Sequence, residues 1–399
     1  MPNSLRNRLG INRTVFILGI VSLLTDISSE GIYPLIPLFL TSVLNTSIVD
    51  IGLIEGIAQS TASIARIFSG WISDRLGDRK WVTTVGYGLS TISKPLLAIS
   101  SSWQQVFGIR FADRLGKGIR SAPRDALIAD VTPPESRGIS FGFHRAMDTV
   151  GAITGPLLAF WLLRSVGLSY RSIFWLSAVP GILAVIVLIV FVRNPARKSE
   201  TPEKPPSLSM RGFSRNFKLF LIIVVIFSLG NSSDAFLILR ARDIGIAPAN
   251  ILLVYVLFNT VEASFSMAAG AASDRLGRKN VILTGFIIFT AVYAGFGAAT
   301  RPTEIWILFG VYGLFNALTQ GVQRAFASDL VSAETRGTGL GAYHMATGIA
   351  LLPASLIAGF LWQNIGPSAP FYYGASMALI ASMLLIVLFR NSTTIYTGR

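Results

Sequence analysis

The stretch "GWISDRLGDRK" at residues 70–80 follows a long apolar run, and a near copy, "GAASDRLGRK", follows another at residues 270–279. Two further pairs repeat in the same order: "DISSEG" (26–31) with "GNSSDA" (230–235), and "PESRGISFGFH" (134–144) with "AETRGTGLGAYH" (333–344). Repeats at corresponding places predict a chain built from two halves of common design.

Composition points to a membrane environment. Of the 399 residues, 52% are hydrophobic and only 14% are charged, whereas about 25% are charged in an average soluble domain. Runs such as 182–192 and 219–230 are almost wholly apolar, which is typical of lipid-facing helices. The chain has no cysteine and two histidines, so we expect no disulfide, thiolate metal site or multi-histidine zinc site. No resident metal and no cofactor are expected. No cleavage site follows the first apolar run, so we interpret that run as a retained helix.

Charged residues, proline and glycine divide the chain into apolar stretches of the length that crosses a bilayer. The expected spans are roughly 14–40, 49–72, 81–101, 104–126, 139–163, 171–192, 218–239, 248–272, 280–299, 304–327, 338–362 and 370–389. The fourth expected span contains many charges. We retain it because the spans before and after it require one more membrane crossing between them. The polar, proline-rich segment 193–217 predicts a cytoplasmic linker between an N-terminal bundle, 1–192, and a C-terminal bundle, 218–399.

Lysine and arginine in the loops give the orientation, because they accumulate on the cytoplasmic side. If the N-terminus is cytoplasmic, most loop cations lie inside. The outer segments then hold Arg164, Arg171, Arg240, Arg242 and Arg301. We therefore expect both termini on the cytoplasmic side of the inner (plasma) membrane. The net charge of +14 follows from these short loops, so no nucleic-acid partner is expected. The lack of an extra domain predicts a monomer.

The repeated polar motif resembles the signature between helices two and three of the major facilitator superfamily. The matching residues are Gly70, Asp74, Arg75, Gly77 and Arg79 in the first copy, and Asp274 and Arg275 in the second. The resemblance implies an all-α membrane protein with twelve transmembrane helices in two pseudo-symmetric six-helix bundles. It also implies that this charge cluster is a conformational latch. The alternative is a topology anchor made of loop cations.

The fifth expected span carries a second resemblance. Gly142, Gly151, Gly155 and Pro156 are similar to the helix-five signature of drug–proton antiporters in that family. The family pattern ends in a glycine pair, where this chain has Ala159 and Phe160. Glycines four residues apart also allow close helix packing, so packing without any bearing on transport direction is the alternative.

Ionisable residues inside a membrane span are costly and are functional by default. Asp26 and Glu30 lie one turn apart on one face of the first span. Two carboxylates this close repel, and a proton on one of them relieves the repulsion. The pair predicts a proton-coupling site. The alternative is a structural ion pair with a basic residue elsewhere.

The fourth span supplies basic partners. "RLGKG" (114–118) resembles the family's helix-four signature, which implies a proton-coupling role for Arg114. Lys117 stands where the family has glutamine, which favours an anionic or zwitterionic substrate. The expected substrate-cavity residues are Asp26, Glu30, Arg110, Lys117, Asn231, Asp234 and Gln320.

These features predict a proton-coupled secondary transporter rather than an enzyme, since no nucleophile–base set or phosphate loop is found. The leading interpretation is an efflux antiporter for a small organic or drug-like molecule, working by rocker-switch alternating access. Its partners would be that molecule, protons and the lipid bilayer. The alternatives are an uptake symporter or facilitator for a small anionic or zwitterionic solute, and a divalent-metal exporter.

Overall fold

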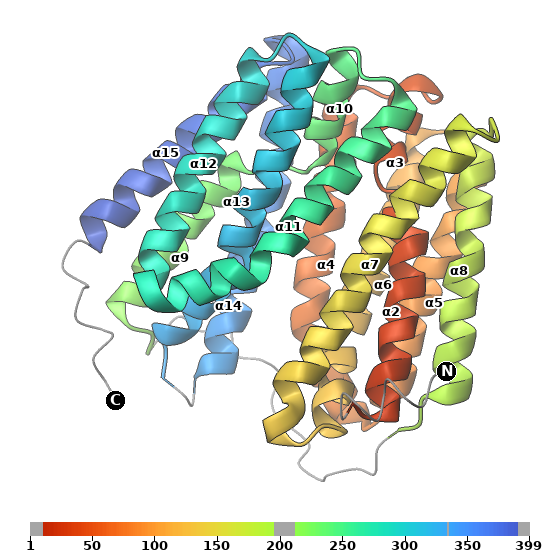
Figure 1. The fold of residues 1–399 in the computed structure, drawn as a ribbon, viewed down its shortest axis with the longest axis vertical. Coiled ribbons are helices and arrows are strands. Elements are labelled where there is room, and N and C mark those ends of the chain that lie inside the picture. The colour runs from red at the N-terminus through yellow and green to blue at the C-terminus, as the bar shows by residue number, and fades with distance from the viewer. Residues whose placement is uncertain (1–10, 195–211, 333–334, 390–399) are drawn as a thin grey trace. The chain divides into compact units, whose positions relative to one another are not determined.

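The computed structural model describes residues 11–194, 212–332 and 335–389, and these form helices without any strand. The helices are α2 (Arg13–Glu30), α3 (Leu35–Ser42), α4 (Ile48–Leu76), α5 (Arg79–Ile99), α6 (Trp103–Asp130), α7 (Arg137–Arg164), α8 (Tyr170–Phe191), α9 (Arg215–Gly230), α10 (Ala235–Asp243), α11 (Pro248–Leu276), α12 (Arg278–Ala298), α13 (Pro302–Asp329), α14 (Arg336–Asn364) and α15 (Ala369–Leu388), with a short 3-10 helix, η1, at Pro134–Ser136 (Figure 1).

These helices make twelve spans within the described residues, because α2 with α3 and α9 with α10 each form one span. Ten of the spans are long and apolar enough to cross a membrane. The other two are α5, which is rich in serine, threonine and glycine, and α6, which carries many charged residues, as the sequence indicated for the fourth span. The fold class expected from the sequence, an all-α membrane protein with twelve spans in two six-helix bundles, is confirmed.

The first and seventh spans are interrupted, which the apolar pattern did not predict. The first breaks between α2 and α3 at residues 31–34, where Pro34 has no backbone N–H to continue the helix. The seventh breaks between α9 and α10 at residues 231–234. There the Ser233 hydroxyl accepts a hydrogen bond from the Ala235 N–H at 3.3 Å. Short polar side chains compete in this way with helical hydrogen bonds.

The chain divides into two compact units. Of the described residues, the first unit contains those up to Thr46, those from Ile57 to Asn194, and Pro248–Val256. The second contains Ser47–Gly56, those from Gly212 to Ala247, and those from Leu257 to Phe389. The start of α4 therefore packs within the second unit and the start of α11 within the first. The expected linker at 193–217 lies mostly outside the described residues, and the proposed bundle boundaries at 192 and 218 stay a prediction.

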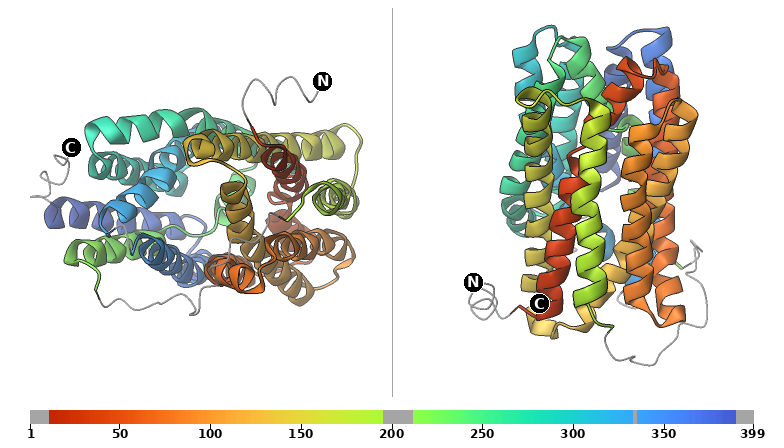
Figure 2. Two further views of the ribbon diagram at one scale, coloured as in Figure 1. Left: turned by 90° about the horizontal axis from the view of Figure 1, so that it is seen from below. Right: turned by 90° about the vertical axis from the view of Figure 1, so that its right-hand side faces the viewer.

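Glycine contacts hold the first unit together. In α5 and α6, a Cβ at Gly116 would lie 2.6 Å from the Gly86 carbonyl oxygen, so the two helices touch backbone to backbone. The helix α2 packs on α7 and α8, and α2 and α8 run side by side in the right-hand view of Figure 2. The apolar core around α2 includes Val15, Leu18 and Val21, all fully buried. Close packing of α2 fixes the position of its acidic residues.

An aromatic core fills the second unit. The rings of Phe227 and Phe286 stack with centroids 4.0 Å apart, and those of Phe289 and Tyr293 stack at 3.9 Å. Phe315 packs edge-on against Phe289 at 4.9 Å. These residues come from α9, α12 and α13, so the aromatic core joins three spans.

In each unit a buried or half-buried arginine donates hydrogen bonds to carbonyl groups at the end of a helix. Arg171 donates to the Ala98 carbonyl at 2.6 Å, near the end of α5. Arg240 donates to the Phe296 and Ala299 carbonyls at 3.0 and 2.9 Å, at the end of α12. The last carbonyls of a helix have no partner within the helix, so both arginines stabilise an end of the bundle.

Candidate functional site

The two acidic residues of α2 differ in their surroundings. Glu30, in the last turn of α2, accepts a hydrogen bond from the Tyr255 hydroxyl at 3.0 Å and lies 3.8 Å from the Lys117 ammonium. Asp26, one turn earlier, is half-buried and makes no hydrogen bond or ion pair with any other residue in the described part of the chain. The structure therefore holds Glu30 in place and leaves the Asp26 carboxylate unpaired.

A third carboxylate, Asp148 of α7, lies close to Asp26, and it was not among the expected cavity residues. Asp148 accepts a hydrogen bond from the Ser22 hydroxyl and lies 3.6 Å from Nδ1 of His144. Asp148, Glu30, Lys117 and Arg120 are the charged side chains that act on Asp26. Only the packing of α7 against α2 brings Asp148 to this place, so spacing along the chain could not have indicated it.

Glycines of α7 make that packing possible. A Cβ at Gly151 would lie 2.7 Å from the Leu23 carbonyl oxygen and 2.8 Å from the Asp26 Cβ. A Cβ at Gly155 would lie 2.7 Å from the Ile27 carbonyl oxygen. In contrast, Gly142 has no atom within 4 Å of such a Cβ, and Pro156 is buried inside the continuous helix α7. Gly151 and Gly155 of the helix-five signature thus determine how close α7 comes to the α2 carboxylates.

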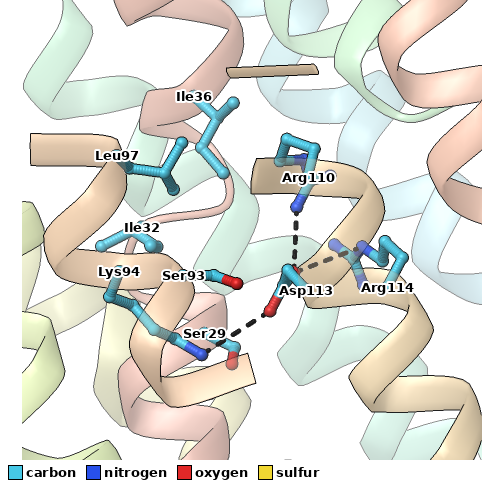
Figure 3. A pocket seen from close by; sticks show the side chains of 9 residues that line it. All are labelled: Ser29, Ile32, Ile36, Ser93, Lys94, Leu97, Arg110, Asp113 and Arg114. Carbon is cyan, nitrogen blue, oxygen red and sulfur yellow. Dashed lines mark hydrogen bonds and ion pairs between the residues drawn. The ribbon is translucent and has the colours of Figure 1, made fainter. Parts of the chain in front are cut away.

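Two basic residues of α6, Arg110 and Arg114, lie around Asp113 (Figure 3). Its carboxylate accepts a hydrogen bond from the Ser90 hydroxyl at 2.5 Å. The Lys94 ammonium lies 3.7 Å away, and the guanidinium nitrogens of Arg110 and Arg114 lie 3.4 and 3.7 Å away. Both arginines were expected at the site from the sequence, whereas Lys94 and Asp113 were not. Lys94 reaches it from the neighbouring α5.

The break between α2 and α3 connects these two groups of charges. The guanidinium carbons of Arg110 and Arg114 lie 5.7 and 5.5 Å from the centre of the Tyr33 ring, within the range of a cation–π interaction. The Tyr33 ring in turn lies 5.8 Å from that of Tyr255, whose hydroxyl binds Glu30. The break therefore places an aromatic ring between the basic and acidic groups of the first unit.

The predicted residues of the second unit are only partly brought together. Asp234 accepts a hydrogen bond from the Tyr312 hydroxyl at 2.9 Å, and Asn231 accepts one from Tyr293 at 3.4 Å. Gln320 is exposed, and no contact of its side chain with Asn231 or Asp234 occurs in the described residues. The two tyrosines belong to the aromatic core, and no sequence signal marked them as partners of these residues.

The repeated motif forms the same ion-pair arrangement in both units. In the first, Arg79 binds Asp74 at 2.7 Å and also pairs with Asp130, the last residue of α6. In the second, Arg278 binds Asp329, the last residue of α13, at 2.5 Å and lies 3.8 Å from Asp274. In each unit one arginine therefore joins the end of one helix to the end of another.

The other motif residues have separate roles in the structure. Arg75 lies over the Trp71 ring at 5.4 Å, and Arg275 is exposed. Gly77 has a φ of 66°, in the left-handed region that favours glycine. A Cβ at Gly70 would be 3.4 Å from the Ala122 Cβ, which is ordinary contact. The partners Asp130 and Asp329 lie far from the motif in sequence, so the motif alone could not indicate them.

No group of three or more histidine, cysteine, aspartate or glutamate residues suited to hold a metal ion is found in the described residues.

Comparisons with known proteins place the chain in a family. The family model described as Major Facilitator Superfamily matches residues 18–239 and 219–395. An uncharacterised MFS-type transporter of Methanocaldococcus jannaschii is 37% identical over 94% of this chain and 95% of its own length. The cis,cis-muconate transport protein of Acinetobacter baylyi is 24% identical over 90% of each chain. Among solved structures, a point mutant of the nucleoside transporter NupG has a TM-score of 0.79 at 15% identity, covering 94% of this chain and 100% of its own. The chain belongs to the major facilitator superfamily of membrane transporters.

Proposed function

We propose that this transporter is proton-coupled and exports a small organic molecule in exchange for protons, by rocker-switch alternating access. The observation that carries the proposal is the unequal environment of two carboxylates on α2. Glu30 is held by Tyr255 and Lys117, whereas Asp26 is half-buried and unpaired among the described residues. A carboxylate of this kind can gain and lose a proton without first breaking an ion pair.

A proton on Asp26 would change the electrostatics of the first unit. It removes one negative charge beside Asp148 and Glu30, the two carboxylates that act on Asp26. The repulsion between α2 and α7 falls, while the pull of Asp26 on Lys117 and Arg120 is lost. If one conformation of the transporter binds the proton better than the other, protonation shifts the equilibrium between them. Arg114 would act with the acidic residues through Tyr33, which it contacts.

The proposal includes the membrane orientation expected from the loop cations. Both termini would be cytoplasmic, the membrane would be the plasma membrane, and the transporter would act as a monomer. Symport of an anionic or zwitterionic solute is the second candidate, because Lys94, Arg110 and Arg114 share one carboxylate in the first unit.

The direction of proton movement separates the two candidates. The full chain would be reconstituted into liposomes that enclose a pH-sensitive dye, and ethidium or cis,cis-muconate would be added outside. Exchange carries protons out as the probe enters, so the lumen becomes more alkaline. Symport carries protons in with the probe, so the lumen becomes more acidic. Uptake of either probe without any change in luminal pH would contradict proton coupling, and empty liposomes control for leakage.

The ion pairs of the repeated motif give a further prediction. Arg79→Gln removes the link between Asp74 and Asp130, and we expect it to slow transport by about tenfold. Loss of a charge-assisted network of this size costs about 1–2 kcal/mol. This loss destabilises whichever conformation of the transporter contains the ion pairs of Arg79. Because the pairs are partly exposed, the protein should still fold.

Transport of the probe into liposomes measures this effect. The matched control is Arg75→Gln, because Arg75 belongs to the same motif but contacts only the Trp71 ring in the described structure. Equal transport rates for the two variants would show that the Arg79 link has no part in the conformational change.

A further inference from the structure

A buried histidine, His144 of α7, lies beside the acidic residues of the proposed proton site. His144 is 4% exposed, and its Nδ1 lies 3.6 Å from a carboxylate oxygen of Asp148, one turn further along the same helix. The other carboxylate oxygen of Asp148 accepts a hydrogen bond from the Ser22 hydroxyl of α2. Ser22 and Asp26 are in turn one turn apart on α2. These four residues therefore follow the interface between α2 and α7, with His144 at one end and Asp26 at the other.

The positions of these residues along the helices place His144 nearer to one end of the first unit. The helices α2 and α7 pack together, and both begin at the lower end of this unit in Figure 1. His144 is about two turns into α7, whereas Asp26 is about three and a half turns into α2. The loop cations predict that this end faces the cytoplasm. His144 thus lies between Asp26 and the expected cytoplasmic end of the helices.

The surroundings of His144 contain charges of both signs. The charged side chains that act on it are Asp148 and Arg145 of α7, and Asp125 and Arg124 of α6. Two carboxylates attract a proton to the imidazole, and two guanidinium groups repel it. Arg124 is itself bound to Asp125 at 2.8 Å. An imidazole with opposing neighbours of this kind can both take up a proton and release it, as a relay requires.

The second ring nitrogen of His144 has no role in holding the helices together. Nε2 is buried and has no hydrogen-bond partner among the described residues. The great majority of buried polar atoms in proteins have such a partner, so this exception calls for a functional reason. An imidazole binds a proton at either nitrogen. A histidine that passes a proton on uses one nitrogen to take the proton up and the other to release it.

The repeat in the sequence provides an internal comparison. His344 occupies in the second copy the place that His144 occupies in the first. One turn after His344 stands Gly348, where the first copy has Asp148. His344 is half-buried, and its ring contacts that of Tyr343. The histidine is thus present in both copies, but only the first copy has a carboxylate one turn after it.

We propose that His144 is a proton relay of this transporter, which carries protons between Asp26 and the cytoplasm by way of Asp148. The inference rests on the proposed proton coupling at Asp26. The proton of the Asp26 carboxylic acid passes to the Asp148 carboxylate and then to Nδ1 of the imidazole, which becomes positively charged. Release of a proton from Nε2 to water on the cytoplasmic side returns the imidazole to its neutral form. Both carboxylates are then negatively charged again.

Two modes of transport in liposomes separate a relay from a structural role. In the first mode, an imposed pH gradient drives uptake of the probe that the unmodified protein transports, ethidium or cis,cis-muconate. In the second mode, the pH is equal on both sides, and labelled probe enters in exchange for unlabelled probe inside. Exchange moves the loaded transporter back and forth, so it needs no net release of protons. A relay is therefore required for the first mode only.

His144→Asn is the decisive variant, because the asparagine amide nitrogen takes the place of Nδ1 beside Asp148 but cannot carry a proton. We expect gradient-driven uptake to fall about tenfold, since a positioned proton carrier is removed, while exchange keeps its rate. His344→Asn, the same change at the corresponding place of the second copy, should leave both modes unchanged. If His144→Asn does not fold, His144→Gln takes its place. Unchanged uptake in the folded variant, or an equal loss of uptake and exchange, would overturn the proposal.

Asp148→Asn tests the path of the relay. It should also reduce gradient-driven uptake and spare exchange, because the amide oxygen can still accept the hydrogen bond from Ser22. The combined variant, His144→Asn with Asp148→Asn, should be no slower than the slower single variant, since both changes interrupt one path. Losses that multiply in the combined variant would show that the two residues act independently, and this result would also overturn the proposal.

The relay and the proposed function fail separately. Loss of gradient-driven uptake in Asp26→Asn with normal uptake in His144→Asn would remove the relay alone. Normal gradient-driven uptake in both variants would remove the proton site at Asp26 as well.

Discussion

Replacing Asp26 with asparagine is expected to reduce proton-driven transport by about 100-fold, while the amount of folded protein in the membrane stays the same. Asparagine has nearly the same shape as aspartate but cannot gain or lose a proton. The reduction corresponds to a loss of about 2.7 kcal/mol of coupling free energy, within the usual range for coupled sites. Folding is spared because Asp26 makes no hydrogen bond or ion pair with the other described residues.

The matching change at Glu30 should behave differently. In Glu30→Gln the amide can still accept the hydrogen bond from Tyr255, but the attraction to Lys117 is lost. We expect a smaller reduction in transport and a small loss of stability, since one partner of a half-buried ion pair is removed. This contrast follows from the different partners of the two carboxylates.

Uptake of the probe into liposomes under an imposed pH gradient measures both variants. Glu135→Gln, at an exposed acidic residue of η1, is the control and should transport like the unmodified protein. If Asp26→Asn together with Glu30→Gln left gradient-driven transport unchanged, the proposed proton site would be wrong.

Alanine at Gly155 is expected to lower the melting temperature of the purified protein by about 5 °C and to reduce its yield. The added Cβ would lie 2.7 Å from the Ile27 carbonyl oxygen and 2.8 Å from the Gly31 nitrogen. Both are backbone atoms, so the clash cannot be relieved by turning a side chain. The helices α2 and α7 must separate, and overpacking of this kind costs about 1–3 kcal/mol.

Gly142→Ala is the matched control, because Gly142 lies in the same helix and no atom is within 4 Å of the place that an alanine methyl would take. Alanine is also the better helix former, so this variant should melt at or slightly above the temperature of the unmodified protein. Thermal unfolding followed by intrinsic fluorescence measures both. Identical melting temperatures for the two variants would show that α2 and α7 adapt to a larger side chain at Gly155.

Much of the fold could be predicted from local patterns. The length and hydropathy of each run predicted the spans, and the duplicated motif predicted two related halves. The breaks at 31–34 and 231–234 were not predicted, because a proline or a polar stretch of four residues was taken as part of a longer span. Pro34 ends the first helix because it has no backbone N–H, and short polar side chains at 231–234 compete for the backbone hydrogen bonds of the second.

The candidate site was predicted in part. Spacing placed Asp26 and Glu30 on one face of one helix, because residues four apart are neighbours in any helix. It could not assign their partners. Tyr255 is 225 residues from Glu30, and Asp148 reaches α2 only because glycines let α7 approach. Lys94 and Asp113 likewise meet because α5 packs tightly on α6.

The sequence by itself determined the membrane class, the number of spans and the duplication, because each depends on composition and on periods of a few residues. Only the tertiary structure decided which carboxylate is paired and which is not, and which cations share Asp113. Those outcomes depend on distances of a few ångströms between side chains from separate helices. Helix packing sets these distances, and no spacing along one segment contains them.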